Sequence, residues 1–301
     1  MQLLKAPDKK YLLIINPMSK MGRGLRRAFW LITRLILRRA YFEAAYTRRP
    51  GHAERIVSEF KEEVDVVVAI GGDGTVREVV NGLMKRKKKS TLAVMPAGRG
   101  NDFASLIGIG KSKKRALSAI LNGKNKEVDL LKFQDRYATN VVGLGYDASV
   151  QEKAGRYKYF AVIRYLIAAI ILIIKGPVAY PMRIEHAKGS WEGKFFIVII
   201  GHTRKYAKHI RIFPGLEIDG GIMRVAAIPP VNRLMALVIL FAAGLGLAGR
   251  FRHVLMVDTP WVLVTPEKTT KAQCDGDLFY VGQGETLHVE LKRAAITVRV
   301  P

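Results

Sequence analysis

A continuous apolar run that stops at a cluster of glycines most constrains how this chain can fold. Residues 66–70 are all apolar, and the next five residues are Gly71, Gly72, Asp73, Gly74 and Thr75. A run that is apolar at every position predicts a strand buried on both faces, as in a parallel sheet. The glycines leave backbone N–H groups unscreened, and the helical pattern that follows adds a helix N-terminus, which favours anions. The sequence therefore predicts a phosphate-binding turn at the end of this strand.

Polar residues in and after this turn extend the prediction. The carboxylate of Asp73 would repel a phosphate unless a cation lies between them, so Asp73 indicates Mg²⁺. Thr75 and Glu78 have the spacing of a capping box, which predicts that Thr75 is the N-cap of the next helix.

Three further strands are predicted around this turn, and polar residues follow each of them. Residues 10–15 precede Asn16, residues 41–47 end at Thr47, and residues 91–95 precede a second glycine-bearing turn. That turn contains Gly98, Arg99, Gly100, Asn101 and Asp102. Because ligands of open α/β sheets bind outside the carboxyl ends of the strands, we expect these residues to share one site.

The charge of the chain indicates an anionic partner. Its 301 residues include 50 Lys and Arg against 25 Asp and Glu, a formal net charge of +25. The basic residues are dispersed in several groups, among them 26–39, 85–89 and 111–115, and no zinc-knuckle, RNP or basic-zipper pattern accompanies them. We therefore expect a membrane surface or a nucleotide as the anionic partner, and no nucleic acid.

Cysteine content and apolar runs bear on the compartment. Cys274 is the only cysteine, which excludes an intrachain disulfide. No signal peptide is recognised, and the apolar runs 165–174 and 234–249 are shorter than a spanning helix, which needs about 20 residues. These features predict a cytoplasmic protein with core or interfacial helices, bound peripherally at the inner face of the membrane.

The sequence pattern changes near Leu130. Before it, strands alternate with helices; after it, short β-rich runs follow one another with few helices. We expect a Rossmann-like α/β nucleotide domain over residues 1–130 and a C-terminal antiparallel β-sandwich over residues 131–301. The last strands could return to the first domain, and the sequence leaves this open.

Three strings carry a resemblance to a known family. GGDGT at 71–75, NPMSK at 16–20 and PAGRGNDFA at 96–104 resemble motifs of the diacylglycerol kinase catalytic family, in its soluble bacterial form. NAD kinases and phosphofructokinases have related GGDG strings, but the run 101–104 favours lipid kinases. Lys20 stands where the family usually has glycine, and Arg99 where it has threonine.

The resemblance implies ATP and Mg²⁺ as cofactors and assigns roles to residues. Asp73, Asp102 and Asp129 would orient the nucleotide metal, and Asp277 would be the general base, where the family has glutamate. A structural Mg²⁺ would be held by Asp219 and the carbonyls of Leu216 and Gly221. The residues implied in nucleotide binding are Asn16, Thr47, Gly71, Gly72, Asp73, Gly74, Thr75, Gly98, Arg99 and Asn101.

These features together predict an ATP-dependent lipid kinase. The γ-phosphate would go to a lipid hydroxyl, with diacylglycerol as the first candidate and phosphatidic acid as the product. A polyprenol, phosphatidylglycerol, a sphingoid base and NAD are alternative acceptors. The departures Lys20, Arg99 and Asp277 keep open a catalytically silent regulator that binds lipid or nucleotide. The expected partners are a lipid with a free hydroxyl and an anionic membrane surface, and a homodimer is left open.

Overall fold

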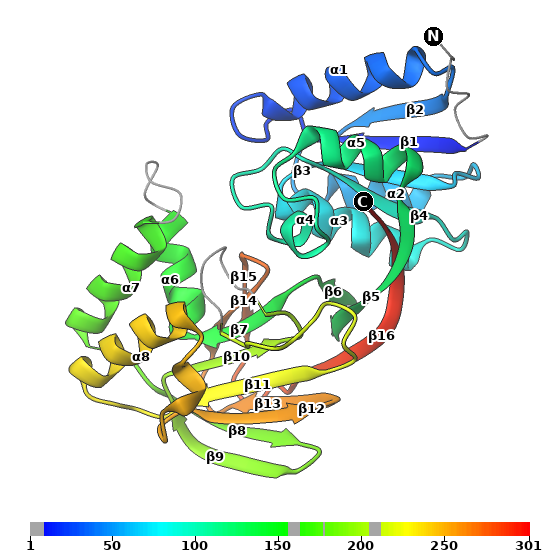
Figure 1. The fold of residues 1–301 in the computed structure, drawn as a ribbon. Coiled ribbons are helices and arrows are strands. Elements are labelled where there is room, and N and C mark those ends of the chain that lie inside the picture. The colour runs from blue at the N-terminus through cyan, green and yellow to red at the C-terminus, as the bar shows by residue number, and fades with distance from the viewer. Residues whose placement is uncertain (1–8, 156–162, 177, 205–211) are drawn as a thin grey trace. The chain divides into compact units, whose positions relative to one another are not determined.

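The computed structural model describes residues 9–155, 163–176, 178–204 and 212–301 (Figure 1). Its contacts divide the chain into two compact units. The first consists of Met1–Val128 together with Ala294–Pro301, and the second of Asp129–Arg293. Strands β5 (Lys124–Phe133) and β16 (Leu287–Val300) each contribute residues to both units.

The first unit is built on a parallel sheet with the order β2-β1-β3-β4. These strands are β1 (Lys10–Ile15), β2 (Tyr41–Tyr46), β3 (Val66–Gly71) and β4 (Thr91–Pro96). Every residue of β3 is buried, as its uniformly apolar sequence predicts. The end of β16 extends the sheet, because Val298 pairs in parallel with Leu92.

Helices connect the parallel strands. They are α1 (Arg23–Ile36), α2 (His52–Glu59), α3 (Asp73–Lys85), α4 (Asp102–Leu106) and α5 (Lys113–Asn122). Right-handed crossovers in this strand order place α1 on one face of the sheet and α2 with α3 on the other. Helices α2 and α3 approach closely at Gly82, where an added Cβ would lie 2.7 Å from the carbonyl oxygen of Glu54 and from Cβ of Val57.

The second unit contains two groups of antiparallel strands. One is a sheet with the order β12-β11-β10-β7-β14-β15, and in the other β16 pairs with β13, which pairs with β8 and then β9. Apolar side chains from both groups, such as Leu144, Val198 and Val264, form one core cluster. An α/β unit followed by an antiparallel β-sandwich is the predicted fold class, which is confirmed. The strands are β6 (Arg136–Ala138), β7 (Val141–Gly145), β8 (Tyr180–His186), β9 (Gly189–Phe195), β10 (Ile197–Gly201), β11 (Met223–Ile228), β12 (Leu255–Thr259), β13 (Trp261–Pro266), β14 (Thr270–Cys274) and β15 (Asp277–Val281).

Three α-helices in the second unit pack together through apolar residues. They are α6 (Tyr146–Gly155), α7 (Ile163–Lys175) and α8 (Arg233–Leu245), and a short 3₁₀ helix, η1 (Ala248–Arg250), follows α8. The sequence predicts one helix over 157–174; its first residues lie outside the described part of the chain, and the described part is α7. Helix α6 begins where the sequence predicts only a glycine turn.

Two glycines within helices allow a test of the close contact between α2 and α3. Gly82→Ala should lower the free energy of unfolding, because the new Cβ meets the backbone of Glu54. Gly244→Ala in α8 is the matched control, because an added Cβ there meets nothing within 4 Å. It should raise stability by about 0.5–1 kcal/mol, the usual gain of alanine over glycine in a helix. Denaturant unfolding measures both, and equal effects would contradict the packing account.

Candidate functional site

Two glycine turns interlock at the carboxyl ends of β3 and β4. The backbone N–H groups of Ala97 and Gly98 donate to the carbonyl of Gly71, at 2.7 and 3.2 Å. A Cβ added to Gly98 would come closer than 3.0 Å to Cα of Gly72, an approach that real Cβ atoms do not show. Glycine is therefore required at position 98 by packing of the two turns, in addition to any contact with a ligand.

The side chain of Asp73 fastens the second turn to the first. Its Oδ2 accepts a hydrogen bond from the backbone N–H of Asn101 at 2.7 Å, and its Oδ1 accepts one from that of Phe103 at 3.2 Å. Asp73 is also the first residue of α3, whose N-cap is Gly72. The sequence predicts a metal-linked role for Asp73; the structure adds the role of a clamp on the loop that begins α4.

The predicted capping box at Thr75 and Glu78 is wrong. Helix α3 begins two residues earlier than Thr75, and the Glu78 carboxylate accepts from the backbone N–H of Ala53 at 3.0 Å, in the first turn of α2. Thr75 is buried and its Oγ1 accepts from Nδ2 of Asn16 at 3.0 Å. Thr75 therefore joins the turn after β3 to the loop after β1.

The carboxyl ends of all four parallel strands meet through short backbone contacts. The N–H of Asn16 donates to the carbonyl of Ile70 at 3.0 Å, and that of Thr47 donates to Ile15 at 2.8 Å. Every residue predicted to bind the nucleotide therefore lies in this one unit, at the ends of β1 to β4. Lys20, in the loop after β1, has φ +40°, a left-handed conformation that favours glycine.

Asn101 stabilises the second turn from within. It has a left-handed backbone with φ +61°, its Oδ1 accepts from the N–H of Gly98 at 2.8 Å, and its Nδ2 donates to the Gly98 carbonyl at 3.0 Å. Arg99, between them, is exposed, so its guanidinium is free to move toward a bound anion.

Two carboxylates converge beside Gly100. A Cβ placed on Gly100 would lie 2.5 Å from Oδ2 of Asp73 and 3.6 Å from Oδ2 of Asp102. Two carboxylates on the same side of one residue repel each other, and a cation between them would offset this repulsion. Carboxylate oxygens are the ligands that Mg²⁺ prefers, so these side chains fit a nucleotide-bound Mg²⁺.

Asp129, the third predicted acidic residue, belongs to the second unit. It is buried, its backbone N–H donates to the carbonyl of Ile218 at 2.9 Å, and its Oδ2 accepts from the N–H of Gly221 at 2.7 Å. His202 is fully buried near it, and burial lowers the pKa of this imidazole to about 4, against the opposing effect of the Asp129 carboxylate. Neutral His202 beside Asp129 is a feature that no sequence motif indicates.

The predicted structural metal loop is the segment that Asp129 contacts. Leu216 is buried, Asp219 is exposed, and Gly221 has φ +66°. Across the described residues, no group of three or more His, Cys, Asp and Glu side chains is arranged to hold a metal ion. A Mg²⁺ here would therefore depend on backbone carbonyls in addition to Asp219, as the sequence resemblance implies.

Asp275 and Asp277 flank a tight turn between β14 and β15. Asp275 is a structural anchor, because its carboxylate accepts from the N–H and Oγ1 of Thr139, at 2.6 and 2.8 Å, and from the N–H of Val141 at 3.0 Å. Asp277, the predicted base, is exposed at the start of β15. The turn thus has one carboxylate that anchors the fold and a second one that is exposed.

Hydrogen bonds from α6 and β14 hold the turn between β14 and β15 in place. Gln273 donates to Oδ2 of Asp147 at 2.6 Å and accepts from the N–H of Gly276 at 2.8 Å, while Gln151 donates to the Gly276 carbonyl at 2.7 Å. Asp147 and Gln151 are both on α6. The sequence analysis assigns no role to Asp147; the glycine-bearing string GLGYDA at 143–148 was the only local signal for it.

Two protein-family models match this chain, one in each half. The diacylglycerol kinase catalytic domain matches residues 10–133, and the YegS C-terminal NAD kinase beta sandwich-like domain matches residues 140–296, more than half of the chain. The chain belongs to the diacylglycerol kinase and YegS-like family of lipid kinases. The predicted family is confirmed, and with it, at the level of the family, the expectation of a kinase.

Relatives of this family resemble the chain at moderate identity. A diacylglycerol kinase of Staphylococcus saprophyticus is 26% identical over 74% of each chain, and a Xanthomonas oryzae protein named "Probable lipid kinase YegS-like" is 27% identical over 88% of each. Two solved structures from Bacillus anthracis share the fold over 97% of both chains, with TM-scores of 0.81 and 0.77 at 21% and 23% identity. The second of these is a crystal structure of a diacylglycerol kinase.

Two glycine variants separate packing from ligand binding in the first unit. Gly98→Ala should lower the melting temperature, because its Cβ forces the two turns apart. Gly74→Ala meets nothing within 4 Å and should leave the melting temperature unchanged or higher. If a phosphate is bound against the backbone here, Gly74→Ala should nevertheless weaken Mg–ATP binding in calorimetry. Unchanged affinity in this stable variant would place the phosphates elsewhere.

Proposed function

We propose that this protein is an ATP-dependent lipid kinase that transfers the γ-phosphate of ATP to the hydroxyl of a membrane lipid. The observation that carries the proposal is the pair of interlocked glycine turns with Asp73 and Asp102 converging beside them, in a chain of this family. Exposed backbone N–H groups and a helix N-terminus suit the phosphates, and the two carboxylates suit Mg²⁺.

Each residue has a task in this reaction. The turns at Gly71–Thr75 and Gly98–Asn101 hold the triphosphate in place, and Mg²⁺ neutralises charge on its phosphates when bound. As the lipid hydroxyl oxygen bonds to the γ-phosphorus, the bond from phosphorus to the bridging oxygen breaks and ADP leaves. Asp277 accepts the hydroxyl proton.

Substitution of the proposed base tests this assignment. Asp277→Asn should lower kcat by about 10²–10⁴-fold, the usual contribution of a general base, while Asp277→Glu should retain activity. Because Asp275 anchors the turn, both variants should keep its fold, and the melting temperature checks this. Radiolabelled phosphate transfer to dispersed diacylglycerol measures the effect. Full activity in Asp277→Asn would refute the role of this residue.

Diacylglycerol is the first candidate acceptor, because relatives of this chain include diacylglycerol kinases. A polyprenol, phosphatidylglycerol, a sphingoid base and NAD remain the alternatives. Incubation with labelled ATP and a total lipid extract, followed by separation of the labelled lipids, identifies the acceptor. Nucleotide binding without any labelled product would favour the catalytically silent regulator.

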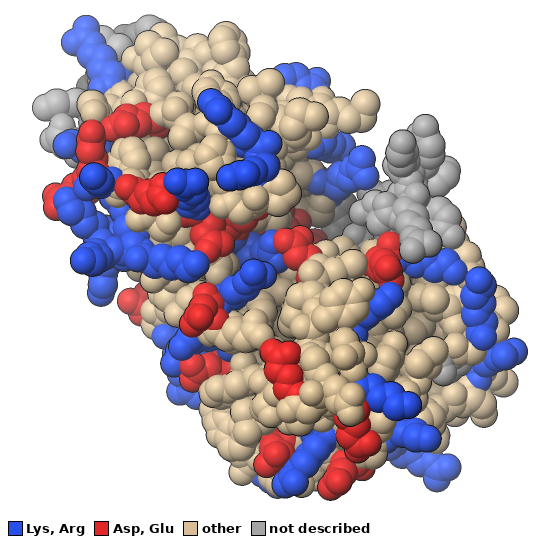
Figure 2. All heavy atoms as spheres, turned by 180° about the vertical axis from the view of Figure 1, so that it is seen from behind, with Lys and Arg blue, Asp and Glu red and all other residues tan. Residues whose placement is uncertain are grey.

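We also propose that the protein acts at an anionic membrane surface. Lys and Arg side chains are spread over the face drawn in Figure 2, with fewer Asp and Glu among them, in agreement with the net charge of +25. An anionic bilayer attracts such a surface, and a lipid acceptor resides in a bilayer. No helix in the described part of the chain combines the length and apolarity needed to cross a bilayer.

Helix α8 offers an apolar stripe for this contact. Its residues Ala236, Ile239 and Ala243 are buried, while Leu234, Phe241 and Leu245 are 73%, 56% and 72% exposed. Positions 234, 238, 241 and 245 share one helix face, and α8 contains no acidic residue. Arg233 begins the helix and Arg250 follows it, so basic residues flank the stripe, as in interfacial helices.

Replacement of the stripe tests the membrane contact. Phe241→Ser with Leu245→Ser should weaken binding to phosphatidylglycerol vesicles by at least about tenfold, because each side chain loses about 1.5 kcal/mol or more of apolar burial. Ile36→Ser with Leu37→Ser removes two equally exposed apolar side chains from the end of α1 and is the control. Vesicle sedimentation at rising salt measures both, and equal losses would remove the special role of α8.

A further inference from the structure

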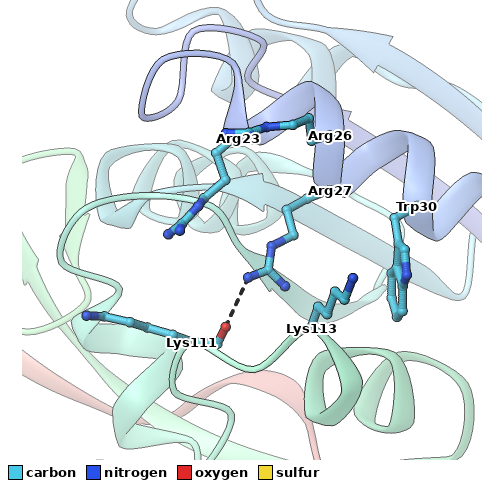
Figure 3. Close-up of a pocket in the computed structure, with 6 residues that line it drawn as sticks. All are labelled: Arg23, Arg26, Arg27, Trp30, Lys111 and Lys113. Atoms are coloured by element: carbon cyan, nitrogen blue, oxygen red, sulfur yellow. Dashed lines mark hydrogen bonds between the residues drawn. The ribbon is translucent and has the colours of Figure 1, made fainter.

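A hollow in the first unit is lined almost entirely by cations. Its volume is about 440 Å³, and its lining residues are Arg23, Arg26, Arg27, Trp30, Lys111 and Lys113 (Figure 3). The first four are spaced along one face of α1; Lys111 lies in the loop before α5, and Lys113 is the first residue of α5. None of the six is acidic. The sequence analysis assigns these residues only to dispersed basic groups.

The guanidinium of Arg27 is held in position but is not fully paired. Its Nη2 donates to the carbonyl of Lys111 at 3.1 Å, and Figure 3 shows the side chain extending from α1 toward this loop. Its Nη1 is buried and has no hydrogen-bond partner within the part of the chain that the structure describes. A buried donor left without a partner costs stability, so a ligand with acceptor oxygens would satisfy it.

Trp30 contacts one of the lining cations, Lys113, and also Arg34, which lies outside the hollow. The ammonium of Lys113 lies 4.9 Å from the centre of the indole ring, and the guanidinium of Arg34 lies 3.8 Å from it. These cation–π contacts keep Lys113 at the rim of the hollow. Lys113 is also the first residue of α5, whose N-terminus adds partial positive charge.

The cations around the hollow repel one another. Burial, followed by the nearby Arg23, lowers the pKa of Arg27. Arg23, then burial, and then Lys111 and Arg99 lower the pKa of Lys20, which lies in the loop before α1 and does not line the hollow. A fold that gathers like charges without a carboxylate among them is stabilised by a bound anion.

We propose that this hollow binds the phosphate groups of a ligand other than the kinase nucleotide. Arg27 and Lys113 would contact the phosphate oxygens, with Arg23, Arg26 and Lys111 around them. The hollow shares no lining residue with the turns at Gly71–Thr75 and Gly98–Asn101. Those turns present Asp73 and Asp102 and require a cation with the phosphate, whereas the hollow suits an anion without metal. The ligand is either a free phosphorylated compound or the headgroup of an anionic phospholipid.

Calorimetric titration with tripolyphosphate in EDTA, without ATP or lipid, tests the site independently of kinase activity. The wild type should bind, and Arg26→Gln with Lys113→Gln should bind at least about tenfold more weakly, because two cationic contacts are lost. Both side chains are exposed, so the variant should fold, and its circular dichroism checks this. Lys87→Gln with Lys89→Gln removes the same charge from an exposed connector and should bind like the wild type.

Competition and vesicle binding complete the test. Excess Mg–ADP should leave tripolyphosphate binding unchanged. Weaker binding of the Arg26/Lys113 variant to phosphatidylglycerol vesicles, with displacement of wild-type protein by tripolyphosphate, would identify a lipid headgroup as the source. Vesicle binding equal to that of the wild type would identify a free phosphorylated compound. Three results would each overturn the proposal. The Lys87/Lys89 variant could lose as much tripolyphosphate affinity as the Arg26/Lys113 variant, Mg–ADP could compete with tripolyphosphate, or the Arg26/Lys113 variant could bind tripolyphosphate as tightly as the wild type.

Discussion

The contact between Gly72 and Gly98 is the constraint on which the rest of the first unit depends. It brings the carboxyl ends of β3 and β4 together so closely that no side chain fits between them. Asp73 then spans from α3 to the backbone of Asn101 and Phe103, so one carboxylate fixes both turns. Because its oxygens already accept backbone hydrogen bonds, the Asp73 side chain is fixed in place, and the proposed Mg²⁺ would lose less entropy in ordering it.

The strands and turns of the first unit were predictable because their signal is local. A continuous apolar run such as β3 predicts a buried strand, and glycine, asparagine and aspartate after it predict a turn. The start of α3 was not predictable, because Glu78 has the spacing of a capping box yet binds the backbone of Ala53 in another helix. Sequence spacing shows which local partners are within reach, but a tertiary contact that becomes available on folding can replace them.

The same reasoning explains what remained unseen in the second unit. Asp147 and Gln273 are 126 residues apart, and their buried hydrogen bond at 2.6 Å depends on α6 packing behind the turn at Gly276. Nothing in either local sequence identifies the other. The basic groups on α1 and before α5 were visible as charge, but their convergence on Arg27 and Trp30 exists only in the fold. The sequence alone therefore does not show which distant segments come into contact in the fold.

The exposure of Asp277 is compatible with its proposed role. A carboxylate is a weak base at neutral pH, and burial next to other acids is the usual way to strengthen it. Phosphoryl transfer through a loose transition state demands little of the base, because the acceptor hydroxyl becomes strongly acidic only as its oxygen bonds to phosphorus. Position then matters more than basicity. Asp275, anchored by Thr139 and Val141, supplies that position by fixing the turn that presents Asp277. The network through Gln273 supports the same turn, so the proposed base is presented by a turn that hydrogen bonds hold in place.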